Sequence, residues 1–199
     1  MNKSYMLKYT YKSPTNLFHG DKKYTLTYIR RMISEFVYDM GNLENNPFTF
    51  PEVQTLLDGI TVGGHKLSDQ NQILNIKSSW DYVIKLSNKE NLSLNKDTIC
   101  SIHKIVAKDE ALIVGDFRNG NIGIAGTTQY ECIEATLLND LFVNDINIIN
   151  KITNPLEKAI IINLWLSYCQ FFYDGNKRTA RLTSNLILIS NDIGVLSIP

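Results

Sequence analysis

The chain has 199 residues, of which 44% are hydrophobic and 20% charged, and its 20 basic and 20 acidic side chains give a formal net charge of zero. This length and composition predict one globular domain with a substantial core. A neutral chain lacks the basic excess of general nucleic-acid or anionic-membrane binders, so both classes of partner are excluded, although a small local anion site remains compatible.

The three cysteines, Cys100, Cys132 and Cys169, form no CxxC or Cys/His cluster. Their odd number and wide spacing favour neither a zinc site nor a disulfide framework. The first residues, MNKSYMLKYTYKS, lack the apolar run of a signal peptide, and no stretch of about 18 apolar residues predicts a membrane span. We therefore expect a cytoplasmic protein with free thiols.

Helical periodicity dominates the chain. Residues 26–40 repeat apolar side chains at helical spacing, and the pattern stops at Gly41–Asn42. A second helix is expected from Thr49, because Glu52 stands at capping-box spacing from it. Further helices are predicted at residues 67–86, 95–108, 154–172 and 176–190.

Two of these helices carry start signals in the sequence. Ser68 or Asp69 is the expected N-cap of the helix at residues 67–86. Asn154 is the expected N-cap of the helix at residues 154–172, with Pro155 at its first position.

Residues 116–131, DFRNGNIGIAGTTQYE, depart from the helical pattern. Ile122 and Ile124 alternate with small residues between glycines, which predicts an extended strand or a loose hairpin. Such an element in a helical protein usually exists to pair with something. A surface loop is the alternative.

The stretch QFFYDGNKRTAR, residues 170–181, has the chemistry of a phosphate site. One helix ends before the Asp174–Gly175 turn, and the next begins at Asn176 or Lys177. The first free N–H groups of that second helix therefore lie at the turn, where they attract anions. Gly175 lets a ligand approach the backbone closely.

Charged side chains near this turn fit a polyphosphate with a metal ion. Arg178 and Arg181 are three residues apart and share a helix face, and an arginine fork matches phosphate oxygens. Asp174 is placed to hold a divalent cation between phosphates. The alternative is structural: Asp174 would cap the helix and the arginines would form surface ion pairs.

The stretch resembles the signature of the Fic (Fic/Doc) family, H-P-F-x-x-G-N-G-R-x-x-R, in which an acid usually precedes the first glycine. The matching residues are Phe172, Asp174, Gly175, Asn176, Arg178 and Arg181. Three further stretches resemble family segments in the right order: NLENNPFTFPEVQTLL (the inhibitory-helix region), VGDFRNGNIGIAGTT (with Gly115, Phe117 and Arg118) and NLILISNDIGVLSIP.

The resemblance implies an all-α Fic fold, a helical bundle with a short β-hairpin flap over the active site. It implies a single Fic domain over residues 1–199, in which residues 1–50 carry the N-terminal helix and the inhibitory segment. No pattern in the sequence indicates an oligomeric state, which leaves an oligomer open.

Most Fic proteins transfer AMP from Mg-ATP to a protein hydroxyl, so the resemblance implies ATP and Mg²⁺ as ligands. It implies that Asp174 binds Mg²⁺, that Asn176 and Arg178 hold phosphates, and that Arg181 holds the γ-phosphate. The backbone of Gly175, Asn176 and Lys177 would form an anion nest. A target protein would dock on the flap by strand addition, at Ile122, Gly123, Ile124 and Gly126.

Departures from the signature bear on activity. Gln170 occupies the catalytic position of the family histidine, which takes the proton from the attacking hydroxyl, and an amide cannot accept that proton. General-base catalysis is worth roughly 10²–10⁴-fold in rate. Phe171 replaces the next proline, and Lys177 stands where many AMP-transferases have glycine. No other histidine replaces the base: His103 is expected to be a packing or surface residue, and His19 and His65 lie in predicted loops.

The inhibitory pattern of the family, S/T-x-x-x-E-G/N, is matched by Glu44 and Asn45, with Met40 at the hydroxyl position. In the family this glutamate pairs with the second arginine and displaces the γ-phosphate. The resemblance therefore implies an intramolecular switch between Glu44 and Arg181. A solvated loop acid is the alternative for Glu44.

Three functions remain open from the sequence. The first is an AMP-transferase that Gln170 impairs. The second is an inactive nucleotide-binding pseudoenzyme that acts as an interaction module. The third is a Doc-like protein kinase, which rests on Lys177 alone.

Overall fold

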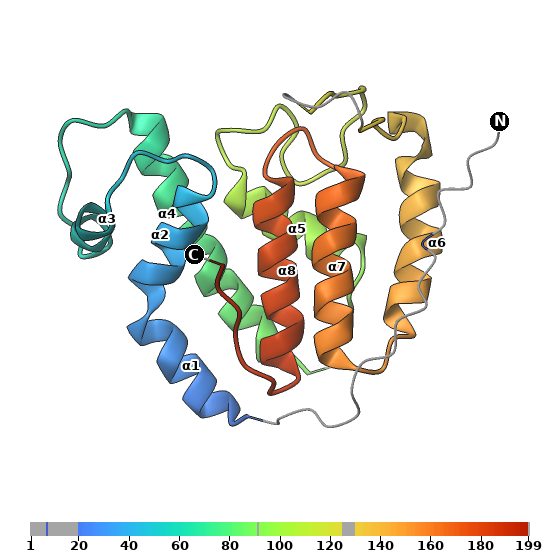
Figure 1. The fold of residues 1–199 in the computed structure, drawn as a ribbon, viewed down its shortest axis with the longest axis horizontal. Helices are drawn as coiled ribbons and strands as arrows, with labels where there is room; N and C mark the ends of the chain where they lie inside the picture. The colour runs from blue at the N-terminus through green and yellow to red at the C-terminus, as the bar shows by residue number, and fades with distance from the viewer. Residues whose placement is uncertain (1–6, 8–19, 91, 125–129, 199) are drawn as a thin grey trace.

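The regular structure is helical in the part of the chain that the computed structural model describes, namely residue 7 and residues 20–90, 92–124 and 130–198 (Figure 1). These residues form eight α-helices and one short 3₁₀ helix. In chain order the elements are α1 (Lys22–Arg31), α2 (Ile33–Asn42), α3 (Phe50–Leu57), α4 (Leu67–Ser87), α5 (Lys96–Val106), η1 (Ala135–Leu137), α6 (Leu138–Asn150), α7 (Pro155–Cys169) and α8 (Asn176–Ser190).

Helix α8 is the central element of the fold. Twelve of its 15 residues are buried, and α7, α4 and α5 pack against it. Two apolar clusters meet at α8: one includes residues of α5, α6 and α7, and the other includes residues of α1 to α5. From Ala180 to Ile189, α8 is therefore packed against the core on both sides.

Of the three predicted capping arrangements, two are confirmed and one is wrong. Thr49 and Glu52 form the capping box of α3, and the Asn154 side chain accepts hydrogen bonds at the start of α7. Helix α4, however, begins at Leu67 with Lys66 as N-cap and no side-chain cap. The Ser68 hydroxyl donates instead to its neighbour Asp69, at 3.3 Å.

The predicted helix at residues 26–40 is divided in two. Met32 has φ −99° and ψ 11°, outside the helical range, so the chain changes direction between α1 and α2. Helix α2 then ends at Asn42. A tight turn follows, in which Glu44 N–H donates to the Gly41 carbonyl oxygen at 3.0 Å. This turn presents Glu44 toward α8.

The expected β-hairpin is not found in the described part of the flap. Residues 122–124 form no strand, and Gly126 lies outside the described residues. The loop is organised by a buried side chain: the Arg118 guanidinium donates to the carbonyl oxygens of Gly120 at 2.9 Å and Ile133 at 2.6 Å. These two bonds hold Gly120 and Ile133, on either side of the flap residues, to one side chain.

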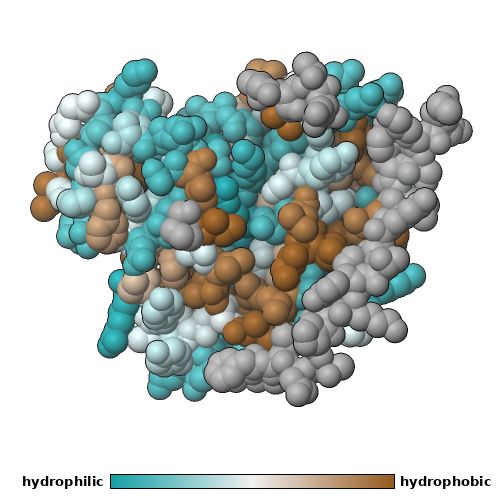
Figure 2. Space-filling view, in the orientation of Figure 1, coloured by the Kyte–Doolittle hydropathy of each residue, from teal (hydrophilic) through white to brown (hydrophobic). Residues whose placement is uncertain are grey.

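Helix α7 is apolar on its outer face as well as toward the core. Ile160, Leu164 and Tyr168 follow one another at four-residue spacing and are 47%, 61% and 64% exposed. Figure 2 shows hydrophobic residues gathered in the middle of this face, where Figure 1 draws α7 and the segment after α8. No helix among the described residues combines the length and apolarity needed to cross a membrane.

Candidate functional site

The turn between α7 and α8 forms the candidate site. Gln170 ends α7 in the left-handed region, with φ 51° and ψ 58°, and Gly175 precedes α8 with φ 71°. Asn176 fastens the turn, because its side-chain amide accepts from Phe172 N–H at 2.9 Å and donates to the Phe172 carbonyl oxygen at 2.8 Å. The turn therefore has a fixed shape before any ligand binds.

Gly175 is required by both conformation and space. Its positive φ disfavours other residues, and a Cβ atom there would lie 2.8 Å from the Cβ of Ala107. As the N-cap of α8 it offers no capping side chain. The N–H groups of Asn176 and Lys177 begin the helix and so have no acceptor within it, which makes them available to an anion.

The two phenylalanines of the turn are buried beneath it. The Phe171 ring, 0% exposed, packs against Phe117 and Trp165, with centroids 4.7 and 4.9 Å away. Phe172 lies parallel to the His103 ring, with centroids 3.7 Å apart. Phe171 therefore anchors the turn in the core at the position where the family signature has proline.

His103 is a packing residue, one of the two roles that the sequence predicts. Its Nδ1 accepts from Gly115 N–H at 3.0 Å, so its Nε2 carries the proton and donates to the Asp174 carbonyl oxygen, also at 3.0 Å. Burial lowers the pKa of His103 to about 4. Because both ring nitrogens are engaged, His103 supports the turn and is not free to remove a substrate proton.

His65, the other histidine among the described residues, does not supply a base to the turn either. His65 lies in the α3–α4 connection and pairs with Glu52 of α3 at 3.0 Å. His19 lies outside the described residues.

Asp174 presents a carboxylate at the mouth of the turn. Its side chain is 53% exposed, and its Oδ1 accepts from Gly175 N–H and, at 3.3 Å, from Arg178 Nη2. No group of three or more His, Cys, Asp or Glu side chains in the described residues could hold a metal ion. A single carboxylate at an anion site suits Mg²⁺ that arrives with phosphates, since Mg²⁺ is usually bound by one or two carboxylates plus substrate oxygens.

Arg178 lies beneath the turn, with its side chain 1% exposed. Its Nη1 donates to Glu110 Oε1 at 2.7 Å and to the Val106 carbonyl oxygen at 3.2 Å. Burial disfavours the charged guanidinium, but the hydrogen bond and negative charge of Glu110 outweigh it and raise the pKa of Arg178. The contact of Arg178 with the site is its hydrogen bond to the Asp174 carboxylate.

Glu110, which the sequence analysis does not identify, is also part of a longer polar chain. Its Oε2 accepts from Gln72 Nε2 at 2.7 Å, and Gln72 Oε1 accepts from Asn46 Nδ2 at 2.9 Å. With the Arg178 contacts, hydrogen bonds run without a break from Asn46, two residues after Glu44, to Asp174. No local sequence signal marks these partners, because they lie 26 to 68 residues apart.

Arg181 and Glu44 meet, as the sequence predicts. Arg181 Nη1 lies 3.3 Å from Glu44 Oε1, and the two side chains are 16% and 20% exposed. Arg181 lies one helical turn after the free N–H groups at the start of α8. Lys177 lies in the first turn of α8 and is exposed. The carboxylate of Glu44 therefore occupies an arginine that could otherwise bind an anion at the turn.

Gln170 is held by hydrogen bonds at both atoms of its side-chain amide. Nε2 donates to the Ser167 carbonyl oxygen at 2.6 Å, and Oε1 accepts from Asn176 Nδ2 at 3.0 Å. Its backbone carbonyl accepts from Arg118 Nε at 2.7 Å. This position therefore has a fixed, neutral side chain and no group that could take up a proton.

The structure thus brings Gln170, Asp174, the start of α8, Arg181 and Glu44 into one site. The loop that leads to residues 122–124 is tied to the turn, since the Tyr173 hydroxyl donates to Asn119 Oδ1 at 2.8 Å. Residues 122–124 lie beyond this contact. The arrangement can hold an anionic ligand with a metal ion, but neither Gln170 nor a described histidine provides a base at the position of the family histidine.

Comparison with known proteins finds a family match that covers the turn between α7 and α8 but not Glu44. Residues 93–188 match the model of the Fic/DOC family. The chain is 24% identical over 184 residues to the protein adenylyltransferase fic-1 of Caenorhabditis briggsae, covering 87% of this chain and 36% of that protein. It is 26% identical over 167 residues to the protein adenylyltransferase Fic of Nematostella vectensis, covering 81% and 38%. The chain thus spans little more than a third of these relatives.

Solved structures of low sequence identity share the fold. A Fic domain containing signaling protein from Bacteroides thetaiotaomicron superposes with a TM-score of 0.77 at 19% identity, covering 87% of this chain and 70% of that one. Fic-1 from Caenorhabditis elegans superposes with a TM-score of 0.69 at 24% identity, covering 87% and 54%. The helical arrangement described above is therefore the Fic fold.

Proposed function

Because the chain carries a Fic/DOC family domain, we propose that it binds Mg-ATP at the turn between α7 and α8 and transfers AMP to a protein hydroxyl at a low rate. The observation that carries this proposal is the uncapped start of α8 at Gly175, beside the exposed carboxylate of Asp174. Relatives that bear the name protein adenylyltransferase support AMP as the transferred group.

In this proposal the N–H groups of Asn176 and Lys177 receive the phosphates, assisted by the positive end of the helix dipole. Gly175 N–H, which the family resemblance adds to this nest, already donates to the Asp174 carboxylate. Arg181 binds the γ-phosphate once it is released from Glu44. Asn176 and Arg178 act by shaping the site, since their side chains are 6% and 1% exposed and hydrogen-bonded within the protein. This restricts the roles that the family resemblance implies for these two residues.

Asp174 is the residue that would hold Mg²⁺. Its half-exposed carboxylate has one oxygen engaged by Gly175 and Arg178, which leaves the second oxygen for a cation. When bound, Mg²⁺ would neutralise phosphate charge.

The transfer requires a proton to leave the attacking hydroxyl. The hydroxyl oxygen bonds to the α-phosphorus, the bond from that phosphorus to the bridging oxygen breaks, and pyrophosphate departs. Gln170 can accept a hydrogen bond from the hydroxyl but not its proton, so the proton must pass to solvent or to phosphate. Loss of a general base lowers rates by roughly 10²–10⁴-fold, which is why we propose slow transfer.

A nucleotide-binding pseudoenzyme is the second candidate. It is favoured by the two hydrogen bonds that fix the Gln170 amide to Ser167 and Asn176, because they give this side chain a structural role of its own. In that case the protein would bind Mg-ATP as an interaction module. A Doc-like kinase has no support beyond Lys177, which is exposed.

We further propose that a target protein docks along the segment at residues 122–124. Gly123 and Ile124 are exposed, so an extended target segment could pair with the backbone here. Gly126, the remaining residue of the proposed flap, lies outside the described residues.

Restoring the base tests the enzymatic proposal. We expect Gln170→His to raise auto-modification by ATP labelled on the α-phosphate by roughly 10²–10⁴-fold. Gln170→Asn is the matched control, because it also disrupts the two hydrogen bonds but adds no titratable group. Label transferred from the γ-phosphate would indicate a kinase instead. Binding of Mg-ATP without transfer in Gln170→His would favour the pseudoenzyme.

A further inference from the structure

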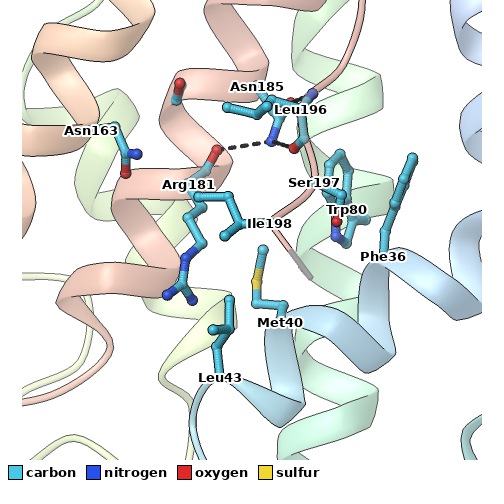
Figure 3. A pocket seen from close by; sticks show the side chains of 11 residues that line it. Phe36, Met40, Leu43, Trp80, Asn163, Arg181, Asn185, Leu196, Ser197 and Ile198 are labelled. Carbon is cyan, nitrogen blue, oxygen red and sulfur yellow. Dashed lines mark hydrogen bonds between the residues drawn. The ribbon is translucent and has the colours of Figure 1, made fainter. Parts of the chain in front are cut away.

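Residues 195–198, here called the bridging segment, run between α2 and α8, and Leu196, Ser197 and Ile198 line a small cavity together with Arg181 (Figure 3). The Asn185 side chain of α8 donates to the Leu196 carbonyl oxygen at 2.9 Å and accepts from Leu196 N–H at 2.8 Å. One residue later, the Ser197 hydroxyl donates to Asp39 Oδ2 of α2 at 2.8 Å. The bridging segment therefore holds both helices through consecutive residues.

Both anchor points lie close to the ion pair. Asn185 Nδ2 also donates to the Arg181 carbonyl oxygen at 3.1 Å, so it fixes the helical turn that carries this arginine. On the other side, Leu43 N–H donates to the Asp39 carbonyl oxygen at 3.1 Å, immediately before Glu44. Hydrogen bonds therefore link the backbone at Arg181 to the bridging segment, and the bridging segment to Asp39 of α2. From Asp39, a backbone hydrogen bond reaches Leu43, the residue before Glu44.

The space between these elements is nearly filled. The cavity there measures about 10 Å³, which is room for no more than one water molecule, so it is a packing seam and not a ligand site. Figure 3 shows Met40 of α2, Leu43 directly after α2 and Ile198 of the bridging segment around it, with Arg181 at its edge. Because almost no free space remains, a displacement of Ile198 would have to be accommodated by Met40, Leu43 or Arg181.

Helix α2 packs on α3 and α4, whereas α8 packs on α4, α5 and α7, so the bridging segment is a direct tie between α2 and α8. We propose that this segment positions Glu44 against Arg181, and that loosening the Ser197–Asp39 bond weakens the restraint on Mg-ATP binding. The effect on ATP rests on the proposed function. The positioning of the turn at residues 43–46 does not.

Hydrogen exchange tests the positioning without any nucleotide. Ser197→Thr keeps the hydroxyl, whereas Ser197→Val has the same shape without it. We expect the backbone amides of residues 43–46, which are hydrogen-bonded in the turn, to exchange about three- to tenfold faster in Ser197→Val than in Ser197→Thr. Equal exchange in the two variants, with unchanged melting temperatures, would overturn the proposal.

Calorimetric titration with Mg-ATP tests the functional consequence. We expect Ser197→Val to bind about three- to tenfold more tightly than Ser197→Thr while Glu44 is present, and equally in a Glu44→Gly background. Unchanged affinity in the presence of Glu44, or an equal gain in both backgrounds, would overturn the link to Glu44. If Glu44→Gly alone binds no Mg-ATP, the proposed function fails, and the exchange experiment still decides the role of the bridging segment.

Discussion

The Arg178 guanidinium lies 2.7 Å from Glu110 Oε1, in a pair that is buried beneath the turn carrying Asp174. This relationship changes how the site works. The Arg178 side chain is not exposed at the anion site. Its Nη2 lies 3.3 Å from Asp174 Oδ1 and so orients that carboxylate. In the proposed function, direct contact with phosphates is then left to the start of α8 and to Arg181.

Removal of Glu110 should be far more costly than removal of an exposed acid. Glu110→Ala leaves a buried guanidinium without its counter-charge, so we expect the free energy of unfolding to fall by about 3 kcal/mol. Asp81→Ala is the matched control: Asp81, with 59% of its side chain exposed, pairs with Lys77, and its loss should cost about 0–1 kcal/mol. Urea unfolding measures both values, and similar losses would contradict a structural role for the Arg178–Glu110 pair.

Gly175→Ala should destabilise the turn. The new Cβ would lie 2.8 Å from the Ala107 Cβ, and alanine is disfavoured at φ 71°. We expect a loss of about 1–3 kcal/mol in thermal or urea unfolding. Gly63→Ala is the control, since a Cβ at Gly63 meets nothing within 4 Å and its φ is not positive; it should be nearly neutral. Wild-type stability for Gly175→Ala would mean that the turn adapts.

Stability should decline as the pH falls from about 6.5 to about 4. Burial lowers the pKa of His103 from 6.5 to about 4, so between these values the unfolded chain binds a proton that the folded protein excludes. The loss should reach about 3 kcal/mol at most. Urea unfolding across this range should show a flatter pH profile for His103→Gln than for wild type.

Glu52 should add a separate loss at lower pH. Hydrogen bonds from Thr49 lower its pKa from 4.5 to about 2, so its stabilising effect is present above pH 4.5 and is lost as the pH falls toward 2. Glu52→Gln should therefore retain the decline between pH 6.5 and 4.5. If His103→Gln retains that decline as well, His103 is not its source.

Local patterns in the sequence predict much of this site. The start of α8 at Asn176 follows from the Asp174–Gly175 turn, and the contact between Glu44 and Arg181 follows from the family resemblance. What these patterns could not reveal is the state of the side chains. Arg178 looks like a surface cation in the sequence and is buried, because its partner Glu110 lies 68 residues away.

Helix α6 shows the same limit for the fold. Residues 138–150 include four asparagines and two aspartates, which are weak helix formers, and no helix was predicted there. Tertiary contacts stabilise this helix: Asp145, 1% exposed, accepts from Trp165 Nε1 at 2.8 Å and from Leu7 N–H at 2.9 Å. Contacts at such sequence separation override local preference.

The most direct test of the central claim is calorimetric titration of the protein with ATP, with and without Mg²⁺. The account predicts Mg²⁺-dependent binding that tightens about tenfold in Glu44→Gly, because Arg181 is then free for the γ-phosphate. It also predicts that Asp174→Ala in the same background abolishes the dependence on Mg²⁺. Absence of binding in Glu44→Gly, at protein concentrations that would detect a millimolar ligand, would contradict a nucleotide site at this turn.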